Sequence, residues 1–163
     1  MKLTKSSRHS KITGDFGEAI VLYLLSRHGF ECARVDHTGI DLIARRPNSK
    51  EVLGISVKSR SRQTGTESSH LALPHEGFVK AKAACDAFGC TPYLALVIDA
   101  GDRIRIFLLS LHHVQKLFPG GRKVSAWQMS EAFVKKYYAD PKIAIFELVM
   151  AHLTKPLKTH MNQ

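Results

Sequence analysis

Two residues on consecutive strand-like segments have the types that metal-assisted phosphodiester cleavage uses. Asp41 lies early in the apolar run 40–46, and Lys58 lies in the β-branched run 53–60. Such cleavage needs a nucleophilic water and neutralisation of the phosphate charge, which Mg²⁺ on hard oxygen ligands supplies and a lysine can assist. Because side chains alternate along a strand, Ser56 and Lys58 are expected to share a face, with Asp41 beside them. A salt bridge between Asp41 and Lys58 alone is the alternative.

The elements that must position these side chains follow from the apolar pattern and the helix and strand breakers. A first helix is predicted from Thr13 or Asp15 to Gly29, and a second over 76–89, ended by Gly89. Between them lie three strands that we expect to pair as a meander, at 30–36, 40–46 and 53–60, and then a loop over 61–75. The run 91–100 reads as a central strand covered on both faces. The remaining predicted elements are a hairpin strand at 103–111, one helical turn from 112, a helix from Ser125 to about Tyr138, and a strand at 142–150.

Charge and composition restrict the class of partner. The 163 residues carry 24 Lys and Arg against 14 Asp and Glu, a formal net charge of +10, which favours binding to a polyanion such as nucleic acid. The basic residues are spread along the chain, so an anion-binding surface must be assembled by folding. Three cysteines without a Cys-x-x-Cys motif argue against a disulfide framework or a zinc ribbon. With no apolar run long enough for a membrane span and no signal-peptide pattern, we expect a cytoplasmic protein.

Three short motifs occur in an order that resembles the PD-(D/E)XK nuclease superfamily, in particular its restriction-endonuclease-like and Holliday-junction-resolvase-like members. They are Gly14-x-x-Gly17-Glu18, Gly39-Ile40-Asp41 and Ser56-Val57-Lys58-Ser59. The resemblance implies an α/β fold with an αβββαβ core over 13–100 and a mixed central sheet. A C-terminal β-α-β extension over 103–163 would complete a single domain, 1–163.

The same resemblance implies roles for three residues. Asp41 would bind a catalytic Mg²⁺ or Mn²⁺, Glu18 would complete the metal site from the first helix, and Lys58 would assist the attacking water. Glu18 also lies three, four and seven residues before Val21, Leu22 and Leu25, on or beside the buried stripe of its helix. The alternative for Glu18 is an acid in the first helical turn, stabilised by the helix dipole.

Ser56 departs from the family pattern, in which an acid precedes the lysine by two residues. A serine is neutral and a poor Mg²⁺ ligand, and three explanations stay open. The missing carboxylate could come from Glu76 at the start of the second helix, as in some restriction endonucleases that this chain resembles. Asp41 and Glu18 could hold the metal with waters, or catalysis could be lost. Glu76 has the same helix-dipole alternative as Glu18.

The function that these residues favour is a Mg²⁺-dependent endodeoxyribonuclease. Candidate contacts to the DNA backbone are Arg60, Arg62, Lys80 and Lys82. The alternative is a catalytically inactive DNA-binding or accessory protein on the same fold. DNA is the expected partner, no membrane contact is expected, and a homodimer is suggested by analogy alone.

Overall fold

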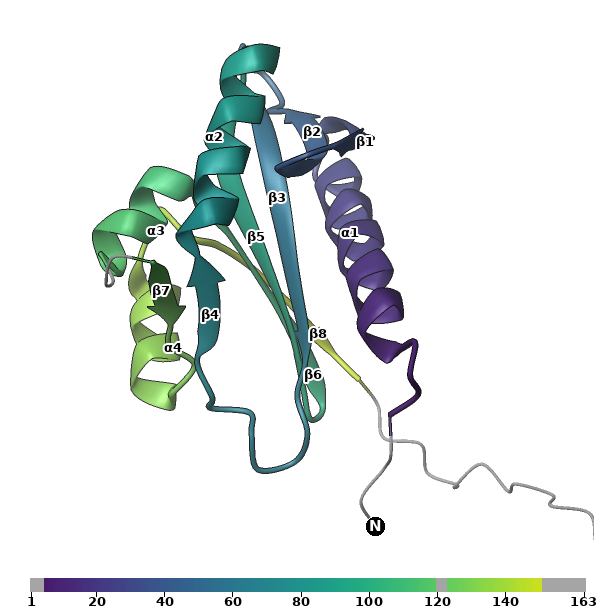
Figure 1. The fold of residues 1–163 in the computed structure, drawn as a ribbon, viewed down its shortest axis with the longest axis vertical. Coiled ribbons are helices and arrows are strands. Elements are labelled where there is room, and N and C mark those ends of the chain that lie inside the picture. Colours follow the sequence, from purple (N-terminus) through teal and green to yellow (C-terminus); the bar gives the residue numbers. More distant parts are fainter. Residues whose placement is uncertain (1–4, 120–122, 151–163) are drawn as a thin grey trace, which may run out of the picture.

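The computed structural model describes residues 5–119 and 123–150, which form a central sheet covered by helices on both faces (Figure 1). The helices are α1 (His9–Arg27), α2 (His75–Phe88), α3 (Leu111–Leu117) and α4 (Glu131–Ala139). The strands are β1 (Glu31–His37), β2 (Ile40–Arg45), β3 (Val52–Ser61), β4 (Leu71–Pro74), β5 (Thr91–Ala100), β6 (Arg103–Ser110), β7 (Val124–Trp127) and β8 (Ala144–Val149). No helix within the described residues is long and apolar enough to cross a membrane.

The main sheet has six strands in the order β1-β2-β3-β5-β6-β8. Strands β3 and β5 are parallel and every other neighbouring pair is antiparallel, so the sheet is mixed, as predicted. Helix α1 covers one face and α2 the other, with the sheet seen nearly edge-on between them in Figure 1. The parallel β3–β5 pair is possible because α2 carries the chain back across the sheet.

The core consists of two apolar layers, one on each face of the sheet. On β5, Leu94, Leu96 and Ile98 belong to the layer under α2. Ala95 and Val97 belong to the layer under α1, because successive side chains of a strand point to opposite faces. This confirms that 91–100 is a central strand buried on both sides.

Two parts of the chain differ from the sequence prediction because they pair with each other. The predicted loop 61–75 contains β4. The helix predicted from Ser125 to Tyr138 is observed only in its second half, because its first residues form β7 and α4 spans Glu131–Ala139. Strands β4 and β7 form a two-stranded antiparallel sheet in which Leu71 faces Trp127. Burial of Leu71, Leu73 and Trp127 stabilises this pairing, and the residues involved are about 50 positions apart, which local periodicity does not reveal.

Helix α1 begins earlier than predicted. Thr13 and Asp15 are not its caps but lie within it, where the Thr13 hydroxyl donates to the His9 carbonyl and Lys11 forms an ion pair with Asp15 at 2.9 Å. The predicted ends are confirmed, because Gly29 and Gly89 follow α1 and α2 with left-handed φ angles of 81° and 64°. The structure also places more in the C-terminal extension than the predicted β-α-β, namely β6, α3, β7, α4 and β8.

Candidate active site

Strand β3 presents Ser56 and Lys58 on the face of the sheet that α2 covers. Both side chains line a cavity of about 210 Å³ between this face and the start of α2, while Val57 points into the opposite apolar layer. The shared face of Ser56 and Lys58 confirms the alternation that the sequence predicted. Ser56 is 5% exposed and Lys58 is half-buried.

Glu76 lies in the first turn of α2 and lines the same cavity. Its carboxylate forms an ion pair with Lys80 one turn later. The hydrogen bond from Lys80, followed by the lysine charge, lowers the pKa of Glu76 below its ordinary value. The cavity therefore has an ionised carboxylate at its rim and two lysines, Lys58 and Lys80, in its lining.

Asp41 lies where β2 leaves β3. The register of the two strands ends at the Leu42–Ile55 pair, and one residue further Asp41 Oδ2 accepts a 2.6 Å hydrogen bond from the Val57 backbone N–H. Because β2 diverges from β3 at this point, the Asp41 carboxylate accepts the hydrogen bond of the Val57 N–H in place of a backbone carbonyl of β2. The carboxylate is thereby held beside β3 at the residue between Ser56 and Lys58. Asp41 and Lys58 make no ion pair within 4 Å among the described residues, so the plain salt bridge is not formed.

Gly39 explains how the β1–β2 turn reaches this position. Its φ of +106° is strained for any residue with a side chain. A Cβ at this position would also lie 2.4 Å from the Lys80 backbone oxygen. Glycine therefore lets the turn that precedes Asp41 rest directly on α2, the helix that carries Glu76.

Glu18 has a different environment from the other two acids. It lies on α1, half-buried beside the apolar stripe as predicted. Its Oε2 accepts a 2.9 Å hydrogen bond from Arg34 of β1, with which it forms an ion pair. Since α1 and α2 cover opposite faces, Glu18 and Glu76 approach the sheet from opposite sides. Within the described residues no three His, Cys, Asp or Glu side chains gather closely enough to hold a metal ion by themselves.

This arrangement of helices and strands matches a solved nuclease structure. The structure of Hjc from Archaeoglobus fulgidus, a Holliday junction resolvase, aligns with a TM-score of 0.55 over 76% of this chain and 88% of that chain. The chain has the restriction-endonuclease-like fold. Hjc belongs to the PD-(D/E)XK superfamily, so the match confirms, at the level of fold, the resemblance that the three motifs predicted. Sequence identity over the alignment is 20%, which by itself shows the fold alone.

Comparisons at the level of sequence give no further guidance. No family model and no curated protein matches this chain.

The predicted DNA-contacting residues differ in how free their side chains are. Arg62 Nη2 donates to the carbonyls of Ser69 and His70, both at 2.9 Å, so this guanidinium holds the loop that follows β3. Burial, and then the charge of Arg60, lowers the pKa of Arg62. Arg60 and Lys82 are exposed, and Lys80 is shared between Glu76 and the cavity.

Sequence reasoning did not single out Tyr93, which lines this cavity and also a larger one. Its hydroxyl bonds to Glu51 at 3.2 Å and accepts from Arg46 at 3.5 Å. Arg46 and Glu51 flank the turn between β2 and β3, whereas Tyr93 lies 42 residues after Glu51 in the chain, so no local spacing in the sequence could have revealed this contact.

Proposed function

We propose that this protein is a Mg²⁺-dependent endodeoxyribonuclease that hydrolyses phosphodiester bonds, with Glu76 replacing the acid missing at Ser56. The observation that carries the proposal is one cavity lined by Ser56, Lys58 and Glu76, with the Asp41 carboxylate fixed on the intervening Val57 amide. The acid from α2 lies on the side of the sheet to which Ser56 points. This position supports the displaced-acid arrangement, which the sequence left as one of three possibilities.

The donor set suits a hard cation that arrives with its substrate. Asp41 and Glu76 offer carboxylate oxygens and Ser56 a hydroxyl, and the hydrogen bond to Val57 uses one of the two Asp41 oxygens. Mg²⁺ is commonly held by one or two carboxylates, with waters and substrate phosphates filling its remaining positions. Asp41 and Glu76 would hold Mg²⁺ or Mn²⁺, and the bound ion would supply charge neutralisation and a more acidic water. Glu18 forms an ion pair with Arg34 on the α1 side and would contact the metal ion at most through a water molecule.

The chain's own cations would bind and orient the DNA. The Lys58 ammonium would contact the phosphate beside Asp41 and orient the attacking water. Lys80 would exchange its ion pair with Glu76 for a phosphate contact, which frees the Glu76 carboxylate for the metal. Arg60 and Lys82, and Arg62 through the loop that it holds, would bind the backbone on either side. A net charge of +10 favours the encounter with DNA.

The test is cleavage of supercoiled plasmid and of end-labelled oligonucleotides in Mg²⁺ or Mn²⁺. We expect Asp41→Ala and Lys58→Ala to lower the cleavage rate by about 100-fold or more, and Glu76→Gln by about tenfold or more. DNA binding in EDTA should change little for Asp41→Ala. Cleavage in Mg²⁺ that survives Asp41→Ala would refute the assignment of the site.

The matched control for Glu76 is Glu131→Gln. Glu131 is also an exposed acid in the first turn of its helix, and it forms the same i,i+4 ion pair, with Lys135 at 3.0 Å. Glu131→Gln removes an equal charge and an equivalent interaction at the start of a helix, and Glu131 does not line the cavity. Equal effects of Glu76→Gln and Glu131→Gln on cleavage would mean that Glu76 only stabilises its helix.

A second candidate function, an inactive DNA-binding or accessory protein, is favoured by Ser56. Its signature is salt-sensitive DNA binding without cleavage at any divalent metal concentration. The Ser56→Glu variant would restore the family's acid two residues before Lys58. Cleavage by this variant, together with none by the wild type, would establish the second candidate and exclude the displaced-acid role of Glu76.

A further inference from the structure

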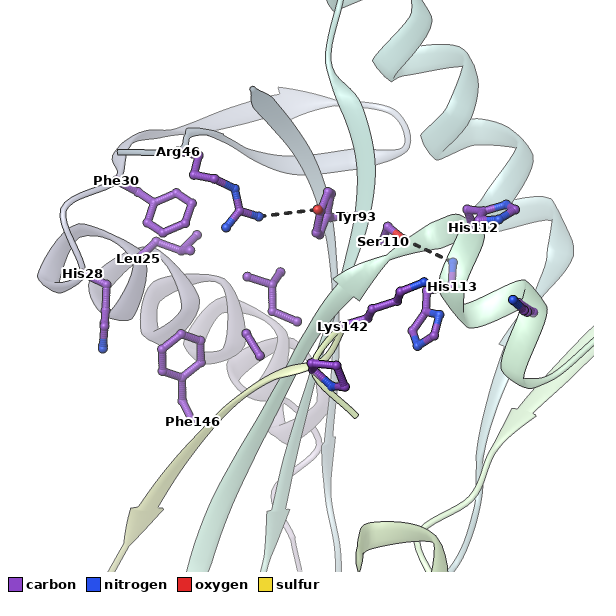
Figure 2. Close-up of a pocket in the computed structure, with 14 residues that line it drawn as sticks. Leu25, His28, Phe30, Arg46, Tyr93, Ser110, His112, His113, Lys142 and Phe146 are labelled. Carbon is purple, nitrogen blue, oxygen red and sulfur yellow. Dashed lines mark hydrogen bonds between the residues drawn. The ribbon is translucent and has the colours of Figure 1, made fainter. Parts of the chain in front are cut away.

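A second and larger cavity, of about 710 Å³, lies on the α1 side of the sheet (Figure 2). It is lined by the end of α1, the segments that follow α1 and β2, the start of β5, the end of β6, α3 and the segment that enters β8. Neither Asp41 nor Lys58 lines it, so it is separate from the candidate active site. Its volume is in the range of small-molecule sites and is ample for one nucleotide.

The lining of this cavity is basic. Its basic members are His28, Arg46, His112, His113, Lys116 and Lys142. No Asp or Glu belongs to the lining within the described part of the chain. Lys116 and Lys142 form no ion pair within 4 Å among the described residues, whereas His113 Nε2 contacts Asp140 at 2.7 Å. The two lysines are therefore the cations most available to an anion that enters from solvent.

The opposite part of the lining is aromatic. Phe30, Tyr93 and Phe146 are each half-buried, so part of every ring faces the cavity. The Arg46 guanidinium lies 5.7 Å from the centre of the Phe30 ring, and His28 meets Phe146 edge-on at 5.0 Å. Figure 2 shows Phe30 and Phe146 on one side of the view and His112 and His113 on the other. The cavity thus combines a stacking wall with a separate cationic wall.

Hydrogen bonds fix Tyr93 of the stacking wall and the neighbouring Arg46 before any ligand binds. Arg46 Nε is 2.7 Å from Glu51 Oε2, and the Tyr93 hydroxyl donates to the other oxygen of the same carboxylate. The hydrogen bond to Glu51 raises the pKa of Arg46. A wall whose side chains are already ordered loses little conformational entropy on binding.

We propose that this cavity binds one unpaired nucleotide of a DNA strand, with the base against the aromatic wall and a phosphate on Lys116 and Lys142. Bases stack on aromatic side chains without regard to sequence, and lysines hold the backbone, which is how single strands are bound. A base inside a duplex is stacked on both faces and cannot enter. The inference rests on the proposed function only in naming DNA as the polymer. Tyr93 lines both cavities, although they lie on opposite sides of the sheet.

The experiment measures binding in EDTA, where no metal-dependent cleavage occurs, by fluorescence anisotropy of labelled oligothymidylate of about 12 nucleotides. We expect the double variant Lys116→Ala/Lys142→Ala to bind about tenfold more weakly at 0.1 M salt. Its slope of log affinity against log salt should be shallower by about 1.4, since each single-strand phosphate contact contributes about 0.7. Phe146→Leu should weaken binding about fivefold without changing the slope, because it removes stacking and no charge.

The control variant is Lys11→Ala/Lys135→Ala, which removes the same two charges from exposed lysines outside both cavities. Binding of the Lys116/Lys142 variant within twofold of this control would overturn the proposal. Equal losses on a duplex of the same length would overturn the preference for an unpaired base. If thymidine 5′-monophosphate binds as tightly as the oligonucleotide, the cavity binds a free nucleotide, and the proposal that it binds a nucleotide of a DNA strand is overturned.

The two proposals fail separately. Asp41→Ala should keep the oligonucleotide affinity of the wild type, because Asp41 lies outside the larger cavity. If the wild type cuts no DNA while the Lys116/Lys142 variant loses single-strand affinity, the nuclease proposal fails and the nucleotide cavity stands.

Discussion

Replacing Gly17 with alanine is expected to separate α1 from β3, the strand that carries Ser56 and Lys58. Gly17 is buried against this strand, and an added Cβ would lie 1.7 Å from Ser59 Oγ and 2.9 Å from Ser59 Cβ. Rotation of the serine could relieve the first contact but not the second. The helix or the strand would therefore have to move.

The size of the effect follows from a comparison with Gly14 on the same helix. Alanine in a helix is favoured over glycine by about 1 kcal/mol, and a Cβ at Gly14 would have no neighbour within 4 Å. Gly14→Ala should therefore raise the free energy of unfolding by about 0.5 to 1 kcal/mol. Gly17→Ala gains the same propensity but incurs an overpacking cost of about 1 to 3 kcal/mol. The difference between the two variants isolates that cost.

Urea unfolding followed by far-ultraviolet circular dichroism gives both free energies, provided that the slope with denaturant is unchanged. Adding Ser59→Ala to Gly17→Ala should recover only part of the loss, because the Cβ contact at 2.9 Å remains. Ser59→Ala alone should be nearly neutral, since the buried Ser59 Oγ has no hydrogen-bond partner within the described residues. If Gly17→Ala is as stable as Gly14→Ala within about 0.5 kcal/mol, the close contact of α1 with β3 does not exist as described.

Three further substitutions test other parts of the structure. Glu18→Gln should slow DNA cleavage less than Glu76→Gln, because Glu18 is bonded to Arg34 on the α1 side; the opposite order of rates would return the metal-binding role to Glu18. Asp140→Asn should destabilise the protein near neutral pH, with a difference that shrinks as pH falls below 3.8, the ordinary pKa of this carboxyl. The backbone N–H of Lys142, and then His113, lowers the pKa of Asp140, so the stabilisation is present when Asp140 is ionised and is lost as it is protonated; a pH-independent difference in unfolding free energy would contradict this. Trp127→Ala should cost about 3 to 5 kcal/mol in thermal or urea unfolding, because the indole is fully buried and stacks on Tyr137 at 4.2 Å; a loss below about 1 kcal/mol would show that the β7 region is not part of the core.

Much of the main sheet could be predicted from the sequence because its signals are local. The five strands predicted up to residue 111 are observed within one residue of their expected ends, and Gly29 and Gly89 end their helices as expected. Strand alternation correctly placed Ser56 and Lys58 on one face. A period of two, or a glycine with positive φ, is a property of a few neighbouring residues and needs no knowledge of the rest of the chain.

The C-terminal region shows where local signals mislead. Ser125 and Gln128 resemble a helix cap and its partner, but Ser125 donates to the Phe118 carbonyl and bonds to His75, and Trp127 lies in a strand. The pairing of β7 with β4 decides this conformation, since Trp127 gains a fully buried position against Tyr137 there. Two aromatic residues of this region, Trp127 and Tyr137, belong to the core.

The sequence by itself determined the residue types of the candidate site, the strands that carry them and the excess of positive charge. Only the tertiary structure decided which acid accompanies which partner: Asp41 with the Val57 amide, Glu18 with Arg34 and Glu76 with Lys80 beside the cavity. It also assembled the larger basic and aromatic cavity from segments spread between Leu25 and Phe146. Strand period and helix caps depend on neighbours in the chain, whereas a carboxylate's partner depends on where separate helices and strands come together in space.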